Sequence, residues 1–179
     1  LMLGILKEQA PRNALIFTNM KYVASRLSKK LKANGHQSRH LTGDLPQNRR
    51  LRIINDFMAG KFAYLVATDV AARGLQIDDL DMVINYDLPQ DSENYVHRIG
   101  RTARAGNTGK AISFACEKTA ANLPAIESLI GMKIPVQKVD HRLYAPIPQE
   151  AVRPEQKFKH HASQKNRSGF RPRKMERQV

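Results

Sequence analysis

The segment Tyr64-Leu-Val-Ala-Thr-Asp-Val-Ala-Ala-Arg-Gly74 contains the pattern that decides the fold. Four apolar residues, Tyr64–Ala67, fit a short buried strand, and a polar pair and several small residues follow at once. Comparable apolar runs occur at 14–17, 82–85 and 111–115, with a weaker one at 38–41. Because a strand that is covered by helices on both faces is apolar throughout, these runs indicate a parallel sheet.

Helical segments separate the apolar runs. Apolar residues recur at helical spacing in 20–31 and in 51–58, and Asn34-Gly35 and Ala59-Gly60 then supply left-handed stops. Two later helices are expected at 92–100 and 120–130. The alternation of strands and helices predicts an α/β fold of three layers, with a mostly parallel sheet covered by helices on both faces.

The composition favours a polyanionic partner. The 179 residues include 30 Lys and Arg against 16 Asp and Glu, a net charge of +14, which points first to nucleic acid and second to an anionic membrane surface. The single Cys116 excludes a disulfide framework, and no Cys/His spacing suggests a metal site. No apolar run is long enough to span a membrane, so the sequence predicts a cytoplasmic protein.

The sequence divides into two parts. Residues 1–148 are expected to form one domain. Residues 149–179 lose the apolar periodicity and contain nine Lys and Arg against three Asp and Glu, so they are expected to form a disordered basic tail. The chain begins without Met, inside what resembles an amphipathic helix, and a fragment of a longer protein is therefore expected.

The run His97-Arg-Ile-Gly-Arg-Thr-Ala-Arg-Ala-Gly106 places three arginines and a histidine within eight positions. If helical geometry continues through it, His97, Arg101 and Arg104 share one face. Such a row suits phosphate oxygens, because a guanidinium stays charged and donates in a fork that matches a phosphate. The alternative is an exposed basic helix end.

A second polar segment follows the strand at 64–67. Thr68 and Asp69 stand at its carboxyl end, where parallel α/β sheets collect their ligands, and Thr68 offers a hydroxyl and an amide to a phosphate. The alternative for this pair is an ordinary helix cap.

Together these segments resemble the later motifs of the DEAD-box RNA helicases, in which two RecA-like domains close over ATP and single-stranded RNA. The four matching stretches are 14–19, 41–50, 68–77 and 97–106, in the family's order and spacing. The resemblance implies the RecA-like form of the three-layer fold. The stretches 115–131 and 134–136 are similar to the bacterial RhlB-type helicases associated with RNA degradation.

The resemblance also implies roles for individual residues. Arg101 and Arg104 would be arginine fingers that reach the γ-phosphate of ATP. His97, Arg98, Asp69, Gly74 and Gln76 would bind ATP or couple the two domains. The implied RNA contacts are Thr18, Asn19, Thr42, Gly43, Gln47, Arg50 and Thr68.

Gln47 carries a second interpretation, and two positions depart from the family. Asp44-Leu-Pro-Gln47 also fits a helix-capping box, which competes with RNA contact by Gln47. Arg49 and Arg52 are expected to be solvated charges. Ala103 replaces the usual Gly, a mild change if φ is negative there, and Gln76 replaces the Asp that contacts the ATP ribose in many members.

Two elements of a complete helicase are absent from these residues: a Gly-x-x-x-x-Gly-Lys-Ser/Thr loop and an Asp-Glu-Ala-Asp sequence. The stretch 106–111 imitates the loop, but it lacks a hydroxyl residue after Lys110 and leads into a predicted strand rather than a helix. We therefore expect half of an enzyme that is inactive alone, with ATP and Mg²⁺ held mainly by a missing N-terminal RecA-like domain.

The implied partners are RNA, that N-terminal domain and a degradosome endoribonuclease scaffold. The basic tail would add RNA affinity or dock such a partner, or it would serve solubility alone. Two rival functions stay open: a non-catalytic RNA-binding adaptor that kept the RecA scaffold, and a DNA helicase or remodeller of superfamily 2.

Overall fold

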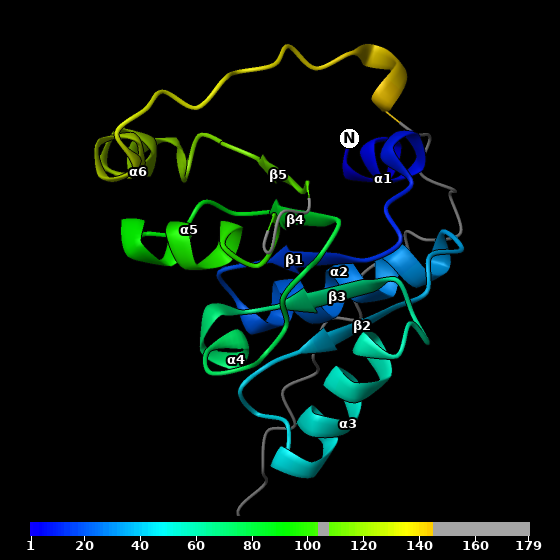
Figure 1. Ribbon diagram of the computed structural model, residues 1–179. Coiled ribbons are helices and arrows are strands. Elements are labelled where there is room, and N and C mark those ends of the chain that lie inside the picture. The colour runs from blue at the N-terminus through cyan, green and yellow to red at the C-terminus, as the bar shows by residue number, and fades with distance from the viewer. Residues whose placement is uncertain (104–107, 145–179) are drawn as a thin grey trace, which may run out of the picture.

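A five-stranded parallel sheet lies at the centre of the computed structural model, which describes residues 1–103 and 108–144 (Figure 1). Its strands are β1 (Ala14–Phe17), β2 (Ser38–Leu41), β3 (Tyr64–Ala67), β4 (Met82–Asn85) and β5 (Lys110–Ser113). They lie in the order β2-β3-β1-β4-β5, and every neighbouring pair is parallel. All five predicted strands are confirmed, and β5 begins one residue earlier than expected.

Helices cover both faces of the sheet, as predicted (Figure 1). The helices are α1 (Met2–Gln9), α2 (Lys21–Ala33), α3 (Gln47–Met58), α4 (Asp69–Ala72), α5 (Ser92–Ile99) and α6 (Leu123–Ile130), with two 3₁₀ turns, η1 (Ala120–Asn122) and η2 (His141–Leu143). The helix expected at 120–130 is thus a 3₁₀ turn followed by α6, with Pro124 in the first turn, where a missing backbone N–H costs no hydrogen bond.

Alternate residues of the strands feed two separate cores. Leu15, Phe17 and Leu65 pack with α3 and α4 on one face. Ala14, Ile16 and the even-numbered residues of β3 and β4 pack with α1 and α2 on the other. β1, β3 and β4 are buried at every position because each of their faces meets a helical layer, which explains their continuous apolar sequence.

The strand order brings three strand ends together. Phe17 at the end of β1 lies in register with Ala67 of β3 on one side and with Asn85 of β4 on the other. The residues that follow these strands therefore meet at one edge of the sheet, beside its central strand. Parallel α/β proteins bind ligands at such an edge.

The segment after α6 crosses back to the N-terminal helix, so that η2 lies against α1 (Figure 1). Gly4 permits this contact, since a Cβ at this position would lie 2.0 Å from the carbonyl oxygen of Leu143. The two ends of the described chain thus pack together.

Two predictions fall outside the described residues: the basic tail at 149–179 and the position of Arg104. Among the residues that the structure does describe, no helix is long and apolar enough to cross a membrane.

Candidate phosphate and nucleic-acid site

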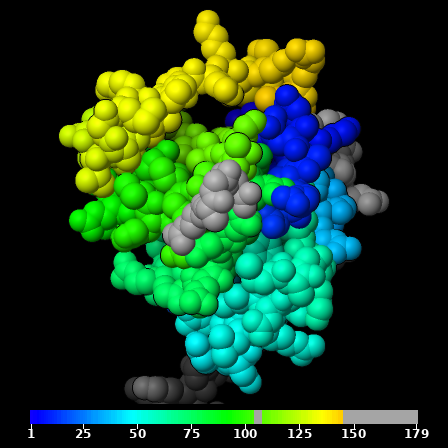
Figure 2. Space-filling view, in the orientation of Figure 1, coloured from blue at the N-terminus to red at the C-terminus, as the bar shows by residue number. Residues whose placement is uncertain are grey.

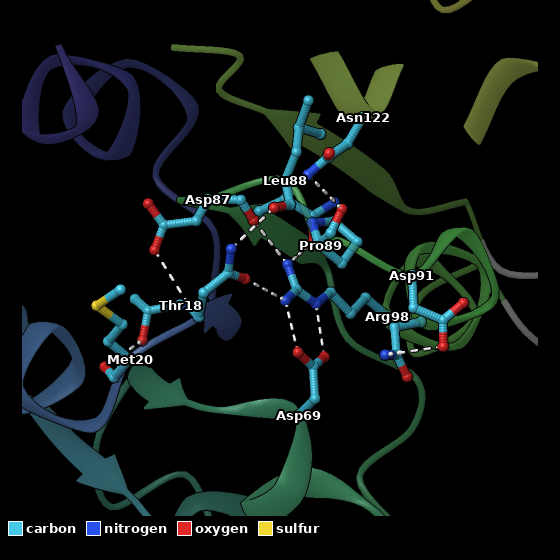
Figure 3. A network of polar contacts seen from close by, with 12 residues as sticks. Thr18, Met20, Asp69, Asp87, Leu88, Pro89, Asp91, Arg98 and Asn122 are labelled. Carbon is cyan, nitrogen blue, oxygen red and sulfur yellow. Dashed lines mark hydrogen bonds and ion pairs between the residues drawn. The ribbon is translucent and has the colours of Figure 1, made fainter. Parts of the chain in front are cut away.

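Arg98 is the centre of the site, and its side chain is only 1% exposed. Its Nε and Nη2 donate to the two carboxylate oxygens of Asp69 at 2.7 and 2.6 Å. Nη1 donates to Asn85 Oδ1 at 3.2 Å and to the carbonyl oxygen of Asp87 at 2.7 Å, and Nη2 also donates to Asn19 Oδ1 at 2.9 Å (Figure 3). One guanidinium thereby joins the ends of β1, β3 and β4 to α5. The alternative of an exposed helix end is wrong for Arg98.

The burial of Arg98 is possible because each nitrogen of its guanidinium has a hydrogen-bond acceptor and an aromatic ring lies beside it. The guanidinium carbon lies 5.1 Å from the centre of the Phe17 ring, a cation–π distance. A buried charge is tolerated when it is paired and fully hydrogen-bonded, and here Asp69 supplies the opposite charge in a bidentate geometry. Arg98 and Asp69 therefore form an ion pair with each other in this conformation, and neither is a free surface group.

The loop after β1 is fixed from the other side. Asn19 donates through Nδ2 to the carbonyl oxygen of Leu88 at 2.9 Å, and its backbone N–H donates to Asp87 Oδ2 at 3.1 Å. Thr18 is 0% exposed, and its hydroxyl donates to the carbonyl oxygen of Met20 (Figure 3). Of this predicted RNA-binding pair, only Asn19 reaches the surface.

A cavity of about 290 Å³ opens beside this network. His97, Arg98, Arg101 and Asp69 line it, so the structure brings four of the predicted phosphate-site residues together. The remaining lining residues are Phe17, Ala72, Arg73 and Asn94. Three arginines and a histidine against one carboxylate make this cavity a fitting place for an anionic phosphate group.

Arg101 is held in position by the loop that follows α4. Its Nη1 donates to the carbonyl oxygen of Leu75 at 2.9 Å and to Asp78 Oδ1 at 3.2 Å, and its side chain is 20% exposed. Both bonds use a single nitrogen, whereas a guanidinium has five N–H donors on three nitrogens. The side chain is thus oriented while one of its faces borders the cavity.

A shared helical face for His97, Arg101 and Arg104 required the helix to continue through Arg101, and it does not. α5 ends at Ile99 with Gly100 as C-cap, and Arg101 and Thr102 then continue in a tighter turn through i→i−3 hydrogen bonds. The chain leaves the helix because Thr102 pairs with Leu80 as an isolated parallel bridge. His97 and Arg101 meet at the cavity through this turn, and Arg104 lies outside the described residues.

Ala103 has a φ of +56°, so the condition for a mild replacement is not met. This left-handed region favours glycine because a Cβ crowds the backbone there. The neighbouring Gly109 shows how tightly this turn packs, since a Cβ on it would lie 1.8 Å from Thr102 Oγ1.

The predicted RNA contacts between β2 and α3 are partly exposed. Gly43 and Gln47 are exposed, whereas Thr42 is buried. The capping-box interpretation is wrong: α3 begins at Gln47, after Pro46, and no side chain caps it. Asp44 instead accepts a hydrogen bond from the Thr42 side chain, which together with the Asp44 backbone N–H lowers the pKa of its carboxyl group.

Arg50 links this segment to the one after β3. Its Nη2 donates to the carbonyl oxygen of Ala71 in α4 at 3.0 Å. Among the side chains that the structure describes, its Nε is the buried nitrogen that lacks a hydrogen-bond partner. A buried donor without an acceptor costs about 1–3 kcal/mol, so an acceptor placed near Arg50 would be favourable.

The remaining predicted residues lie on or beside the loop after β3. Thr68 occupies the N-cap position of α4 but makes no capping hydrogen bond through its side chain, and it is buried. Gly74 has a φ of +73°, which requires glycine, and Gln76 is exposed and does not line the cavity.

Sequence reasoning missed five polar residues of the site: Asn85, Asp87, Arg73, Asp78 and Asn94. A signal existed for the first two, because Asn85 ends a predicted strand that neighbours the central one and Asp87 follows it. Arg73 and Asp78 carried no signal, since their place depends on the path of an irregular loop. Within residues 1–103 and 108–144, no group of three or more His, Cys, Asp and Glu side chains could hold a metal ion.

Comparison with known families gives a direct match. The family model described as "Helicase conserved C-terminal domain" matches residues 1–106. The chain is 53% identical over 152 residues to "ATP-dependent RNA helicase RhlB" of Shewanella baltica strain OS155, a match that covers 84% of the chain and 35% of that protein. The chain therefore spans about a third of the length of such curated relatives.

Solved structures agree with this match. The structure of the E. coli DEAD-box protein SrmB bound to the regulator of ribonuclease activity A has a TM-score of 0.74 and 33% identity, over 83% of this chain and 88% of that one. A DEAD box protein from Methanococcus jannaschii has a TM-score of 0.68 and 39% identity, over 74% and 36%. A variant of Dbp5 from S. cerevisiae, bound to RNA and ADP BeF3, has a TM-score of 0.66 and 37% identity, over 75% and 37%.

Proposed function

Since the chain belongs to the helicase conserved C-terminal domain family and is an RhlB-like, DEAD-box RNA helicase C-terminal domain, we propose that it is half of an ATP-dependent motor. In this proposal it closes on an N-terminal ATPase domain of the same parent protein. It supplies arginine fingers and part of the grip on the RNA backbone, and it remodels or locally unwinds RNA, with RNA decay as the setting.

The observation that supports this proposal best is the network of Arg98. It ties Asp69, the first residue after Thr68, to the helix that carries His97 and leads into Arg101. A shift of the strand ends on RNA binding would therefore move the basic residues at the cavity. Such coupling between two sites requires an element that both of them contact, and Arg98 is in contact with both segments.

Arg101 is proposed as a finger that stabilises negative charge on the γ-phosphate during transfer. Leu75 and Asp78 hold its side chain beside the cavity, and the proposal gives Arg104 the same role. His97, Gly74 and Gln76 are proposed to bind the nucleotide or couple the domains. ATP and Mg²⁺ supply the phosphoryl group and its charge neutralisation, and they are proposed to be held mainly by the N-terminal domain.

The RNA grip is proposed to use the residues that follow the strands. Asn19, Gly43 and Gln47 present exposed groups to a phosphate backbone, and Arg50 offers its guanidinium. Thr18, Thr42 and Thr68 are buried, so they are proposed to act through backbone N–H groups or by shaping this edge. Contacts to phosphate and sugar carry no sequence information, and the grip should therefore be sequence-independent.

The proposal is tested by Arg101→Ala in the full-length parent protein. RNA-stimulated ATP hydrolysis should fall by two orders of magnitude or more, because a finger contributes about 10³–10⁵ to kcat, while RNA affinity is retained. Lys118→Ala, an exposed side chain away from the cavity, is the matched control and should leave hydrolysis unchanged.

Three results would contradict the proposal. Unchanged hydrolysis in a folded Arg101→Ala protein would remove Arg101 from catalysis. No hydrolysis by the unaltered parent would favour the RNA-binding adaptor instead, and equal stimulation by DNA and RNA would favour the DNA helicase.

A further inference from the structure

A second, larger cavity lies away from the Arg98 network, at the free edge of the sheet. It has a volume of about 680 Å³ and is lined by Lys32 of α2, Arg39 and His40 of β2, and Leu45, Asn48, Arg49, Arg52 and Ile53. β2 is an edge strand of the sheet, so side chains from both of its faces line this groove. His40 lies on the α2 side and Arg39 on the α3 side. We call these eight residues the edge groove.

The edge groove is strongly basic. Four of its eight residues are Lys or Arg, and none is Asp or Glu. Asp56 partly compensates the positive charge of Arg39, whose Nη1 lies 3.0 Å from Asp56 Oδ2. The same carboxylate also forms an ion pair with Lys61, whose Nζ lies 2.8 Å from Oδ1. Within residues 1–103 and 108–144, Lys32, Arg49 and Arg52 take part in no ion pair.

The pKa of His40 is lowered, and the causes of this shift indicate the sign of the charge around the groove. Burial lowers the pKa of His40 most, and the positive charges of Lys32 and Arg49 lower it further. Asp44 raises this pKa, and Lys29 makes a smaller contribution that lowers it. The cations around this imidazole thus outweigh the nearby carboxylate. A bound anion would relieve that imbalance.

The first turns of α3 add an independent argument. This helix begins Gln-Asn-Arg-Arg-Leu-Arg with no acidic residue in its first turn and no side-chain cap. The N-terminus of a helix carries a partial positive charge, so arginines there are unfavourable unless an anion is nearby. The arrangement costs stability in the free chain and suits a phosphate.

The helix also connects the groove to the proposed RNA grip. Gln47 and Arg50 lie three residues apart on one side of α3, and Arg49 and Arg52 lie three apart on the next. Asn48, which lines the groove, directly follows Gln47. A strand of RNA that contacts Gln47 could therefore continue past Asn48 into the groove without leaving the protein surface.

We infer that the edge groove binds the phosphate backbone of single-stranded RNA beyond the segment held at the strand ends, with Arg49 and Arg52 as its main contacts. This rests on the proposed function and extends it. The groove is lined by cations and by no Phe, Tyr or Trp, so its main contacts go to phosphates, which carry no sequence information. Long RNA gains contacts that short RNA lacks.

The test compares six-nucleotide and eighteen-nucleotide oligouridylates on the full-length parent protein, with Arg49→Ala/Arg52→Ala as the variant. The variant should lose about tenfold in affinity for the long RNA and keep its affinity for the short RNA within about twofold. Its slope of log K against log salt for the long RNA should be shallower by about 1.4, since each single-strand phosphate contact contributes about 0.7.

The control variant is Lys118→Ala/Lys138→Ala, which removes the same charge from exposed side chains. Neither lysine lines the edge groove. The yellow segment of the chain lies at the opposite end of the molecule from the cyan residues in this view (Figure 2). The control should leave both affinities and the salt slope unchanged. If it reproduces the loss, net charge rather than the groove is responsible and the inference fails.

The two proposals fail differently. If the short RNA binds but Arg49→Ala/Arg52→Ala leaves the affinity for the long RNA unchanged, the edge groove is not an RNA site, and an acidic protein segment becomes its candidate occupant. If the unaltered parent binds neither RNA, the proposed function itself is overturned.

Discussion

At the scale of single residues, the Arg98 side chain connects several loops by hydrogen bonds. It makes five hydrogen bonds to four residues at the carboxyl ends of β1, β3 and β4. One of them, Asp69, is also the first residue of α4. A lysine could not replace it, because an ammonium is a point charge and cannot match Asp69 in a two-pronged geometry. The side chain thus fixes the relative positions of the loops that border the cavity.

Arg98→Ala should lower the free energy of unfolding by about 3–5 kcal/mol, because it leaves the Asp69 carboxylate without its buried partner. Chemical denaturation of the chain measures this loss. Arg73→Ala is the matched control, since Arg73 lines the same cavity but is exposed, and it should change stability by less than about 0.5 kcal/mol. Equal effects of the two variants would show that the buried network contributes no more to the free energy of unfolding than an exposed arginine does.

Ala103 is a strained residue in the turn after Thr102. Ala103→Gly should raise the free energy of unfolding by about 1 kcal/mol, because glycine adopts a positive φ without a steric penalty. Ala33→Gly, in the last turn of α2, should have the opposite sign, since glycine weakens a helix by about 1 kcal/mol. Thermal unfolding of both variants distinguishes the signs, and a destabilised Ala103→Gly would contradict the positive φ.

At the scale of elements, α5 depends on how it starts and stops. Asp91 caps its N-terminus by accepting a hydrogen bond from the Glu93 N–H at 3.0 Å. The helix ends at Ile99 because Thr102 is drawn to Leu80. A helix one turn longer would carry Arg101 away from Leu75 and Asp78, so the early stop is what delivers Arg101 to the cavity.

Asp91→Ala should cost about 1 kcal/mol of stability and increase fraying at the start of α5, because it removes the cap. Amide hydrogen exchange should be faster in 92–95, where the freed N–H groups lie. Asp91→Asn serves as control, since asparagine also caps well and should restore most of the protection. Unchanged exchange in Asp91→Ala would mean that packing against α6 alone holds this helix end.

At the scale of the whole molecule, the two proposed binding surfaces lie at different edges of the sheet. The carboxyl ends of β1, β3 and β4 form one, and the outer side of β2 forms the other. α3 borders both, through Arg50 toward α4 and through Arg49 and Arg52 toward the edge groove. Under the two proposals, a long RNA strand contacts both edges, whereas a nucleotide contacts only the first.

A substitution at Gly4 tests whether α1 holds η2 and the segment between α6 and η2. Gly4→Ala should destabilise the chain by about 1–3 kcal/mol, because a Cβ at this position overlaps the backbone of Leu143. Limited proteolysis should then cut the segment after α6 more readily. The control is Lys7→Ala, an exposed position on the same helix. An unchanged proteolysis pattern would show that α1 does not hold this segment.

The sequence by itself determined the strands, the main helices and the family. Short, continuous apolar runs such as Tyr64–Ala67, alternating with helical segments, indicated strands buried on both faces. Helical spacing and Gly stops marked α2 and α3, so local patterns were sufficient. The sequence also singled out His97, Arg98, Arg101 and Asp69, because clustered cations after a helix and polar residues after a strand are unusual.

Only the tertiary structure decided how these residues are used. The sequence could not show that Arg98 is buried against Asp69, that α5 stops before Arg101, that Ala103 has a positive φ or that Arg49 and Arg52 line one groove. Each of these depends on contacts between segments far apart in the chain, Arg98 and Asn19 being 79 residues apart. Such contacts follow from strand order and loop path, which the spacing of residues along one segment does not encode.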